Sequence, residues 1–301
     1  MRYSKEWEKT VLRTGRWIDF ENDYKTLDPS FMESVWWVFK NLWDKNLIYR
    51  GFKVMPYSTA CNTPLSNFEA GLDYRDVSDP AVMVSFPIIG CGASASLVAW
   101  TTTPWTLPAN VALCVNPEIT YVYVMNPEGK VFVVAEVRIG ALPGATKKEK
   151  GDKRSLVDGW SIVKKVSGSE LRDLRYVPIF PYFEGNLQSS AFKVCCDTYV
   201  TDESGTGVVH LAPAYGEEDY RVCISNEVVI KGGTLPDPVD VNGCFCSPVI
   251  APFAGMHVKE ADKEIICEIK AKVNRCPFRS DTIPILQTLS SLPLIITLRT
   301  R

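Results

Sequence analysis

The 301-residue sequence lacks an apolar run approaching the 18 or so residues that a membrane-spanning helix requires. It also carries little net charge, −2 from 33 basic and 35 acidic side chains, which excludes a uniformly basic nucleic-acid binder. Residues 1–7 are charged and aromatic and lack the apolar core of a secretory signal. Ten cysteines are too few for a disulfide scaffold in a chain of this length. We therefore expect a soluble, intracellular protein with reduced thiols.

Several common catalytic signatures are missing as well. The sequence holds neither a glycine-rich phosphate loop nor a dinucleotide-binding fingerprint, and it has no Gly-x-Ser-x-Gly turn of a serine hydrolase. The cysteines at 195–196 and 244–246 lack the spacing of zinc ligands, so buried thiols are the favoured interpretation. The chain has two histidines, His210 and His257. We therefore expect no metal site.

What the sequence does contain is a helical, aromatic start followed by short strands. Ser4 can cap a helix that ends at Gly15, and Asp28-Pro29 marks the start of a second helix with one apolar face rich in tryptophan, which we expect to pack into a core. From about Val82 the pattern changes to short apolar runs separated by turn residues, among them a hairpin turn signal, Asn-Pro-Glu-Gly, at residues 126–129. Because these strands are short and irregularly spaced, they predict a mixed α/β fold that is mainly β and barrel-like, without a doubly wound sheet.

Two helices are expected among these strands, over residues 167–174, with the Ser-x-x-Glu spacing of a capping box, and over residues 259–272. The basic stretch 146–154 is interpreted as a solvated loop, with contact to RNA phosphate as the alternative. The last residues follow neither helical nor strand periodicity. The predicted divisions are a helical segment at 1–81, a mainly β domain at 82–275 and an irregular tail at 276–301.

The first segment with chemical potential is residues 101–110, Thr-Thr-Thr-Pro-Trp-Thr-Leu-Pro-Ala-Asn, directly after a predicted strand. Pro104 disfavours helical geometry at Thr103, so the threonine hydroxyls project from the end of the strand into whatever cavity the strand faces. An ordinary β-branched strand end followed by a turn is the structural alternative.

The second such segment is residues 205–220, in which two glycines lead into a short strand that ends near His210. A turn follows, and then Glu217, Glu218 and Asp219 open a predicted helix. These acidic residues can be partners of the helix dipole and nothing more. A single histidine at a strand end is likewise compatible with a role in the core.

Together, about 100 residues apart, the two segments resemble the signature pair of the editing domain of isoleucyl-tRNA synthetases, which are class I aminoacyl-tRNA synthetases. The valyl and leucyl relatives usually carry arginine where Thr103 stands, so the resemblance is to the isoleucine branch. Residues 239–245 and 253–256 also match that family. Residues 16–20 and their surroundings are similar to the catalytic-domain segment that precedes the editing insertion in eukaryote-type enzymes. The resemblance covers about residues 1–279.

The resemblance implies an editing reaction, hydrolysis of the ester of valyl-tRNA(Ile). An isoleucine site cannot exclude valine well, because one methylene changes binding by only about 1–3 kcal/mol, and isoleucine selection is the standard example of this limit. The attacking water relies on its position and on the terminal ribose hydroxyl, since the motifs contain no strong general base.

The resemblance also implies a role for each motif residue. Asp219 binds the α-ammonium of the attached amino acid. Thr102, Thr103 and Trp105 line the side-chain pocket and position the ester, while His210 closes the pocket to isoleucine. The catalytic residues implied are Asp219, Thr102, Thr103 and His210, and the substrate-binding residues are Thr101, Trp105, Asp219 and His210.

The sequence departs from the complete family pattern in one respect. It contains neither the His-Ile-Gly-His nor the Lys-Met-Ser-Lys-Ser motif with which class I synthetases activate amino acids with ATP. We therefore expect no isoleucine activation, no cofactor for editing, and ATP use only by a catalytic domain that this chain lacks. The implied partners are tRNA(Ile) carrying valine and the rest of the synthetase, without a membrane or a metal, in the cytoplasm. The alternatives are a non-catalytic tRNA-binding or interaction fragment, and a ligase piece that works only when joined to the catalytic core.

Overall fold

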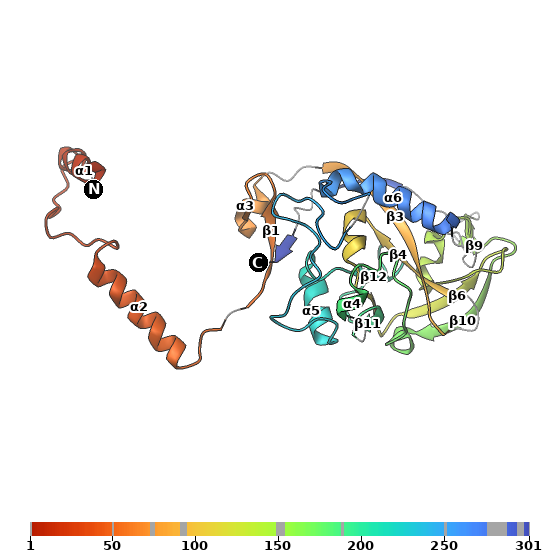
Figure 1. Cartoon of the computed structure of the whole chain (residues 1–301). Coiled ribbons are helices and arrows are strands. Elements are labelled where there is room, and N and C mark those ends of the chain that lie inside the picture. Colours follow the sequence, from red (N-terminus) through yellow and green to blue (C-terminus); the bar gives the residue numbers. More distant parts are fainter. Residues whose placement is uncertain are drawn as a thin grey trace. The chain divides into compact units, whose positions relative to one another are not determined.

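The computed structural model describes residues 2–49, 51–72, 76–90, 95–148, 154–187, 190–249, 252–275, 288–293 and 298–300. The chain divides into two compact units, Met1–Gly51 and Phe52–Arg301 (Figure 1). No described helix is both long and apolar enough to cross a membrane.

The first unit holds two helices, α1 (Arg2–Arg13) and α2 (Pro29–Asp44). Asp28 occupies the N-cap position of α2 with extended backbone and Pro29 follows it, as the sequence predicts, although the Asp28 side chain makes no capping hydrogen bond. The predicted buried face of α2 is wrong, because the helix buries none of its residues and Trp36 is 68% exposed. A pair of helices this short offers too little surface to cover a row of tryptophans.

The second unit begins with a small hairpin. Strands β1 (Val54–Ser58) and β2 (Thr63–Pro64) pair antiparallel, and helix α3 (Asn67–Gly71) follows with a capping box formed by Ser66 and Glu69.

A six-stranded sheet, in the order β10-β6-β7-β4-β3-β13, forms the largest part of this unit. Its pairs are antiparallel except for the parallel pair β4–β7. The predicted turn at residues 126–129 joins β6 to β7, with the Asn126 side chain accepting hydrogen bonds from the backbone of Glu128 and Lys130. The strands are β3 (Asp76–Pro87), β4 (Ala95–Thr101), β6 (Thr120–Met125), β7 (Val131–Ala135), β10 (Ser161–Ser167) and β13 (Thr288–Pro293).

A three-stranded sheet lies beside it, in which β5 (Ala112–Val115) pairs parallel with β11 (Lys193–Cys196) and antiparallel with β12 (Val208–Leu211). Strand β12 also contacts β4 of the larger sheet. One apolar core joins the two sheets and includes the fully buried Leu97 and Leu211. The predicted mixed α/β, mainly β fold is confirmed, and among the described strands the larger sheet has edges at β10 and β13.

Short helices connect the strands. The predicted helix at 167–174 is a single 3-10 turn with the expected capping box, and the helix predicted at 259–272 lies within α6. The connecting elements are the 3-10 helices η1 (Pro104–Ala109), η2 (Glu136–Ala141) and η3 (Gly168–Leu171), the helices α4 (Glu184–Leu187), α5 (Glu217–Ser225) and α6 (Val258–Arg275), and the small hairpin β8 (Thr146–Lys148) and β9 (Arg154–Leu156).

Part of the segment at 276–301, predicted to be irregular, differs from that expectation. Strand β13 pairs antiparallel with β3, and β14 (Leu298–Thr300) pairs antiparallel with β1. Backbone pairing with an exposed strand edge needs no side-chain periodicity, which is why the sequence pattern does not reveal it. Residues 276–287, 294–297 and 301 lie outside the described residues.

Candidate active site

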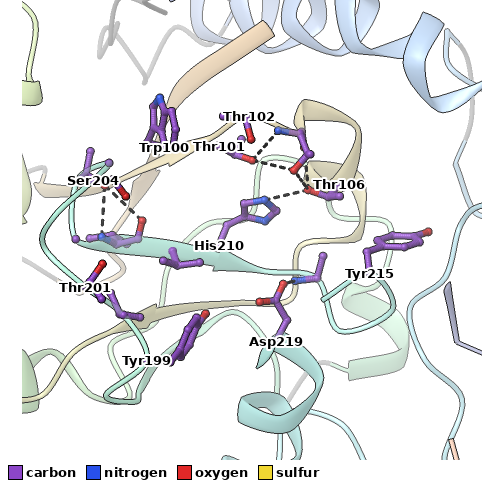
Figure 2. A pocket seen from close by; sticks show the side chains of 18 of the residues that line it. Trp100, Thr101, Thr102, Thr106, Tyr199, Thr201, Ser204, His210, Tyr215 and Asp219 are labelled. Carbon is purple, nitrogen blue, oxygen red and sulfur yellow. Dashed lines mark hydrogen bonds between the residues drawn. The ribbon is translucent and has the colours of Figure 1, made fainter. Parts of the chain in front are cut away.

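A cavity of about 380 Å³ lies where the end of β4 and the turn η1 face β12 and the start of α5 (Figure 2). The structure brings all of the site residues predicted from the sequence to the wall of this cavity. They are Thr101, Thr102, Thr103, Trp105, His210 and Asp219.

Local hydrogen bonds fix the threonine-rich peptide on one wall. The Thr101 hydroxyl accepts a hydrogen bond from the backbone N–H of Thr103 at 3.1 Å and lies 3.2 Å from the Thr103 hydroxyl. Pro104 then starts η1, which the backbone N–H of Thr106 closes by donating to the Thr103 carbonyl at 3.0 Å. The hydroxyls are therefore held in place before any ligand binds, while the Thr102 side chain remains half-buried at the cavity.

His210, on β12, contributes a rigid and uncharged ring to the same cavity. Its side chain points toward η1 (Figure 2), and Nε2 lies 3.0 Å from the Thr106 hydroxyl. That hydroxyl donates its single proton to the Thr103 carbonyl at 2.9 Å, so we assign the ring proton to Nε2. Nδ1 is buried and has no hydrogen-bond partner among the described residues. Burial lowers the pKa of His210 to about 4, so the ring is neutral at neutral pH.

Asp219 is the acidic group of the cavity, in the first turn of α5. Its Oδ2 accepts a hydrogen bond from the backbone N–H of Ala212 at 2.9 Å, which ties the start of α5 to the end of β12. Gly216 makes this possible, because a Cβ at that position would lie 2.7 Å from the Asp219 Cγ. The carboxyl is half-buried, and desolvation raises its pKa to about 7 in spite of the hydrogen bond.

No ion pair to Asp219 is present among the described residues. The ionised carboxylate is therefore costly in this desolvated position and would be stabilised by a cationic group brought by a ligand. The arrangement thus offers an anion beside a row of fixed hydroxyls and a neutral, sterically rigid imidazole.

Sequence reasoning missed several residues of the site. Thr106 stands three positions after Thr103 in the motif and could have been named from the sequence. Its hydrogen bond to His210, however, depends on how the two sheets pack. Tyr215 packs edge-on against Trp105, with ring centroids 4.8 Å apart, so the indole forms a buried wall. Tyr199 lines the cavity with a hydroxyl that has no partner in the described part of the chain. No local pattern marks either tyrosine.

The cysteines agree only in part with the predicted buried thiols. Cys195 and Cys196 are buried in β11, and burial raises the pKa of the Cys195 thiol to about 12. The prediction is wrong for Cys246, which is exposed, because it lies in a loop between turns and not in a strand. Within the described ranges, no three histidine, cysteine or acidic side chains are grouped as metal ligands would be.

Comparison with known proteins agrees with the motifs. Residues 1–278 match the sequence profile of tRNA synthetases class I (I, L, M and V). The chain belongs to this family. It is 55% identical over 290 residues to the cytoplasmic isoleucine–tRNA ligase of Arabidopsis thaliana, which covers 90% of this chain and 24% of that protein. The cytoplasmic isoleucine–tRNA ligase of Mus musculus is 53% identical over 271 residues, covering 90% of this chain and 20% of that protein.

The predicted resemblance to the isoleucine branch of the class I synthetases is confirmed by these relatives, whose names also state the cytoplasmic location that we expected. The chain spans about a quarter or less of their length. Among solved structures, it is similar to the editing domain of the P. knowlesi cytosolic leucyl-tRNA synthetase, with a TM-score of 0.47 and 12% identity over 72% of this chain and 98% of that chain.

The assigned state of His210 can be tested by NMR. With two histidines in the chain, imidazole ¹⁵N signals are assigned by comparison with a His257→Gln variant. We expect His210 to keep the signals of a neutral ring protonated at Nε2 from pH 8 to pH 5, because burial opposes the charged form, and to titrate near the pKa of about 4. A midpoint near the ordinary value of about 6.5 would contradict the burial of this ring.

Proposed function

We propose that this class I synthetase chain carries the editing activity of an isoleucyl-tRNA synthetase and hydrolyses valyl-tRNA(Ile) at its aminoacyl ester. One observation supports this most strongly. The threonine-rich peptide lines a single cavity of about 380 Å³ together with His210 and Asp219, which stand about 100 residues later in the sequence. Both the motifs and the relatives point to the isoleucine branch, in which valine is the amino acid that must be removed.

In this proposal, Asp219 binds the α-ammonium group of the attached amino acid. An ammonium placed beside the carboxylate supplies a cation that no described side chain provides to Asp219, and it lowers the pKa of Asp219 from its raised value of about 7. An aminoacyl group with a free ammonium gains this interaction, whereas one without the ammonium does not. The contact therefore selects an aminoacyl group and fixes where its ester lies.

The threonine peptide then orients the ester. Thr102 lies across the cavity from Asp219 (Figure 2), Thr103 follows it on the cavity wall, and the buried Trp105 forms the apolar side of the side-chain pocket. A water oxygen attacks the ester carbonyl carbon, the bond from that carbon to the ribose oxygen breaks, and the ribose oxygen takes up the proton that the attacking water releases. With a pKa of about 4, His210 is a poor base at neutral pH, so rate enhancement comes from positioning and from the neighbouring ribose hydroxyl.

His210 gives the site its selectivity. The hydrogen bond to Thr106 holds the ring in one orientation, and its burial leaves it little freedom to move aside. We propose that the pocket admits the valine side chain and that the additional methylene of isoleucine meets the imidazole. Isoleucyl-tRNA(Ile), the correct product of the synthetase, would thus be spared because its side chain is excluded from the pocket, and not because its ester is hydrolysed more slowly once bound.

The remaining assignments follow from the same proposal. The reaction needs no cofactor or metal, and ATP is used by the catalytic domain of the synthetase, whose activating motifs this chain lacks. The partners are tRNA(Ile) carrying valine and the rest of the synthetase, in the cytoplasm. The exposed tryptophans of α2 suit the second partner, because an apolar helix face of this size requires covering.

Replacing the anion of the site tests the proposed function. We expect Asp219→Asn to lower kcat/KM for valyl-tRNA(Ile) deacylation tenfold to a hundredfold, since losing a hydrogen bond to a charged group costs about 1.5–3 kcal/mol. The rate is measured on the purified chain and on the full-length synthetase that contains it. Glu217→Gln is the matched control, because Glu217 is exposed and stands two residues away on the same helix. If the folded Asp219→Asn variant deacylates at the normal rate, the assignment of Asp219 is wrong.

Activity in neither form would favour a non-catalytic tRNA-binding fragment, and activity only in the full-length protein would favour a piece that depends on the catalytic core.

The pH profile gives a second measure. The wild-type kcat/KM, corrected for uncatalysed hydrolysis, is expected to rise with pH through about 7, because only the ionised Asp219 of the free enzyme binds ammonium. The Asp219→Asn variant should lack this rise near pH 7.

Changing the ring that closes the pocket tests the proposed selectivity. We expect His210→Ala to keep valyl-tRNA(Ile) hydrolysis within about threefold, while isoleucyl-tRNA(Ile), normally spared, is now hydrolysed, because the removed ring leaves room for one methylene. Both deacylation rates are measured on the same preparation. A general base at this position would instead cost about a hundredfold on both substrates. Unchanged discrimination between valine and isoleucine would exclude His210 as the gate.

A further inference from the structure

A buried carboxylate outside the cavity makes a direct contact with the threonine peptide. Asp262 lies on α6 and is 3% exposed. Its Oδ1 accepts a hydrogen bond at 2.8 Å from the backbone N–H of Trp105, a residue 157 positions earlier in the chain. A carboxylate is rarely buried this deeply unless a specific interaction compensates for the loss of water.

Asp262 accepts its hydrogen bond from the first backbone N–H group that is available at the start of η1. Thr103 is the N-cap residue of this turn, but its side chain makes no capping hydrogen bond. Pro104 follows and has no N–H. The Trp105 N–H is therefore the first free donor of the turn, in a buried place where an unpaired donor is costly. Asp262 performs the capping function from a distant helix.

The position of η1 determines most of the cavity wall. The turn carries Trp105 and Thr106 and fixes the end of the peptide that holds Thr103. Through the Thr106 hydroxyl it also holds the His210 ring. A shift of η1 would consequently move the ester-facing hydroxyls and the ring that limits the pocket at the same time.

Asp262 itself is held by a well-packed helix. Its helix neighbours Ala261 and Ile265 are fully buried in the core that joins the two sheets. Lys259, one turn earlier, forms an ion pair with Asp79 at 2.6 Å and so fixes the start of α6 against β3. Burial raises the pKa of Asp262 to about 7, although the nearby lysine and the Trp105 N–H both favour the anion. The position of the Asp262 carboxyl is therefore set by the packing of α6 in the core.

We propose that Asp262 is a positioning residue of the editing site, which caps η1 from α6 and thereby sets the place of the threonine peptide and of His210. Its effect on catalysis rests on the proposed editing function. The hydrogen bond and its effect on η1 do not, so the two can be tested separately.

The first measurement is hydrogen exchange of the backbone amides in residues 101–110, on the full chain. We expect Asp262→Leu, which removes the acceptor and keeps the branched shape of the side chain, to speed exchange in this peptide at least tenfold. Asp262→Asn keeps an oxygen acceptor and should stay within about threefold of the wild type. Glu264→Leu is the matched control, because Glu264 is an exposed carboxylate on the same helix. Exchange in residues 121–135 of the β6–β7 hairpin reports any general loss of stability.

The second measurement is the kinetics of valyl-tRNA(Ile) deacylation by the same variants in the full-length synthetase. For Asp262→Leu we expect kcat to fall at least tenfold with KM for tRNA within twofold, since tRNA docking is unaffected, and Asp262→Asn should restore most of the rate. If Asp262→Leu does not fold, Asp262→Ser, which is too short to reach Trp105, replaces it.

Two results would overturn the proposal: unchanged exchange and kcat in Asp262→Leu, or equal damage in the Asn and Leu variants. If the wild type shows no deacylation at all, the proposed editing function fails. The exchange measurement then still decides whether Asp262 positions η1.

Discussion

The packing of β12 against β4, which brings the His210 ring to the Thr106 hydroxyl, is the constraint on which the site depends. The hydrogen bond between these two residues joins segments 104 residues apart, one at the end of the six-stranded sheet and one in the three-stranded sheet. Neither partner could be placed without the shared core that packs β12 against β4. Because this core fixes both walls, the cavity exists before a ligand arrives, and selection by size becomes possible. A pocket lined by mobile loops could close around valine and isoleucine equally well.

The charges of the site follow from the same packing. Burial keeps His210 neutral and raises the pKa of both Asp219 and Asp262. The two carboxyls differ in what they face. Asp262 has a permanent partner in the backbone N–H of Trp105, whereas Asp219 lines the cavity and, within the described part of the chain, accepts a hydrogen bond only from the Ala212 N–H. One carboxyl therefore serves the architecture, and the other is available to a cation. This division suits the proposed reaction, in which the substrate carries the missing positive charge.

The sequence predicts those features that depend on neighbouring residues. The turn at Asn126, the capping box of Ser167 and Glu170, the last helix and the mixed, mainly β fold all have local patterns. The site residues could be named because their motifs resemble a known family, not because spacing revealed a cavity. Features set by packing were missed: the contact of Asp262 with Trp105, the capped 3-10 turn and the exposure of the α2 tryptophans. Each depends on which distant surface lies opposite, or on whether any does.

The central claim is that the cavity binds the aminoacyl end of valyl-tRNA through its ammonium and excludes isoleucine by size. It is tested most directly by calorimetric titration, at pH 7 in buffers of different ionisation enthalpy, with valyl-adenosine in which an amide replaces the ester. The account predicts binding with release of part of a proton from Asp219, whose pKa of about 7 falls when the ammonium arrives. The isoleucyl mimic should bind at least tenfold more weakly, and a mimic without the amino group should release no proton. Equal affinity for the valyl and isoleucyl mimics, or valyl binding without proton release, would contradict the account.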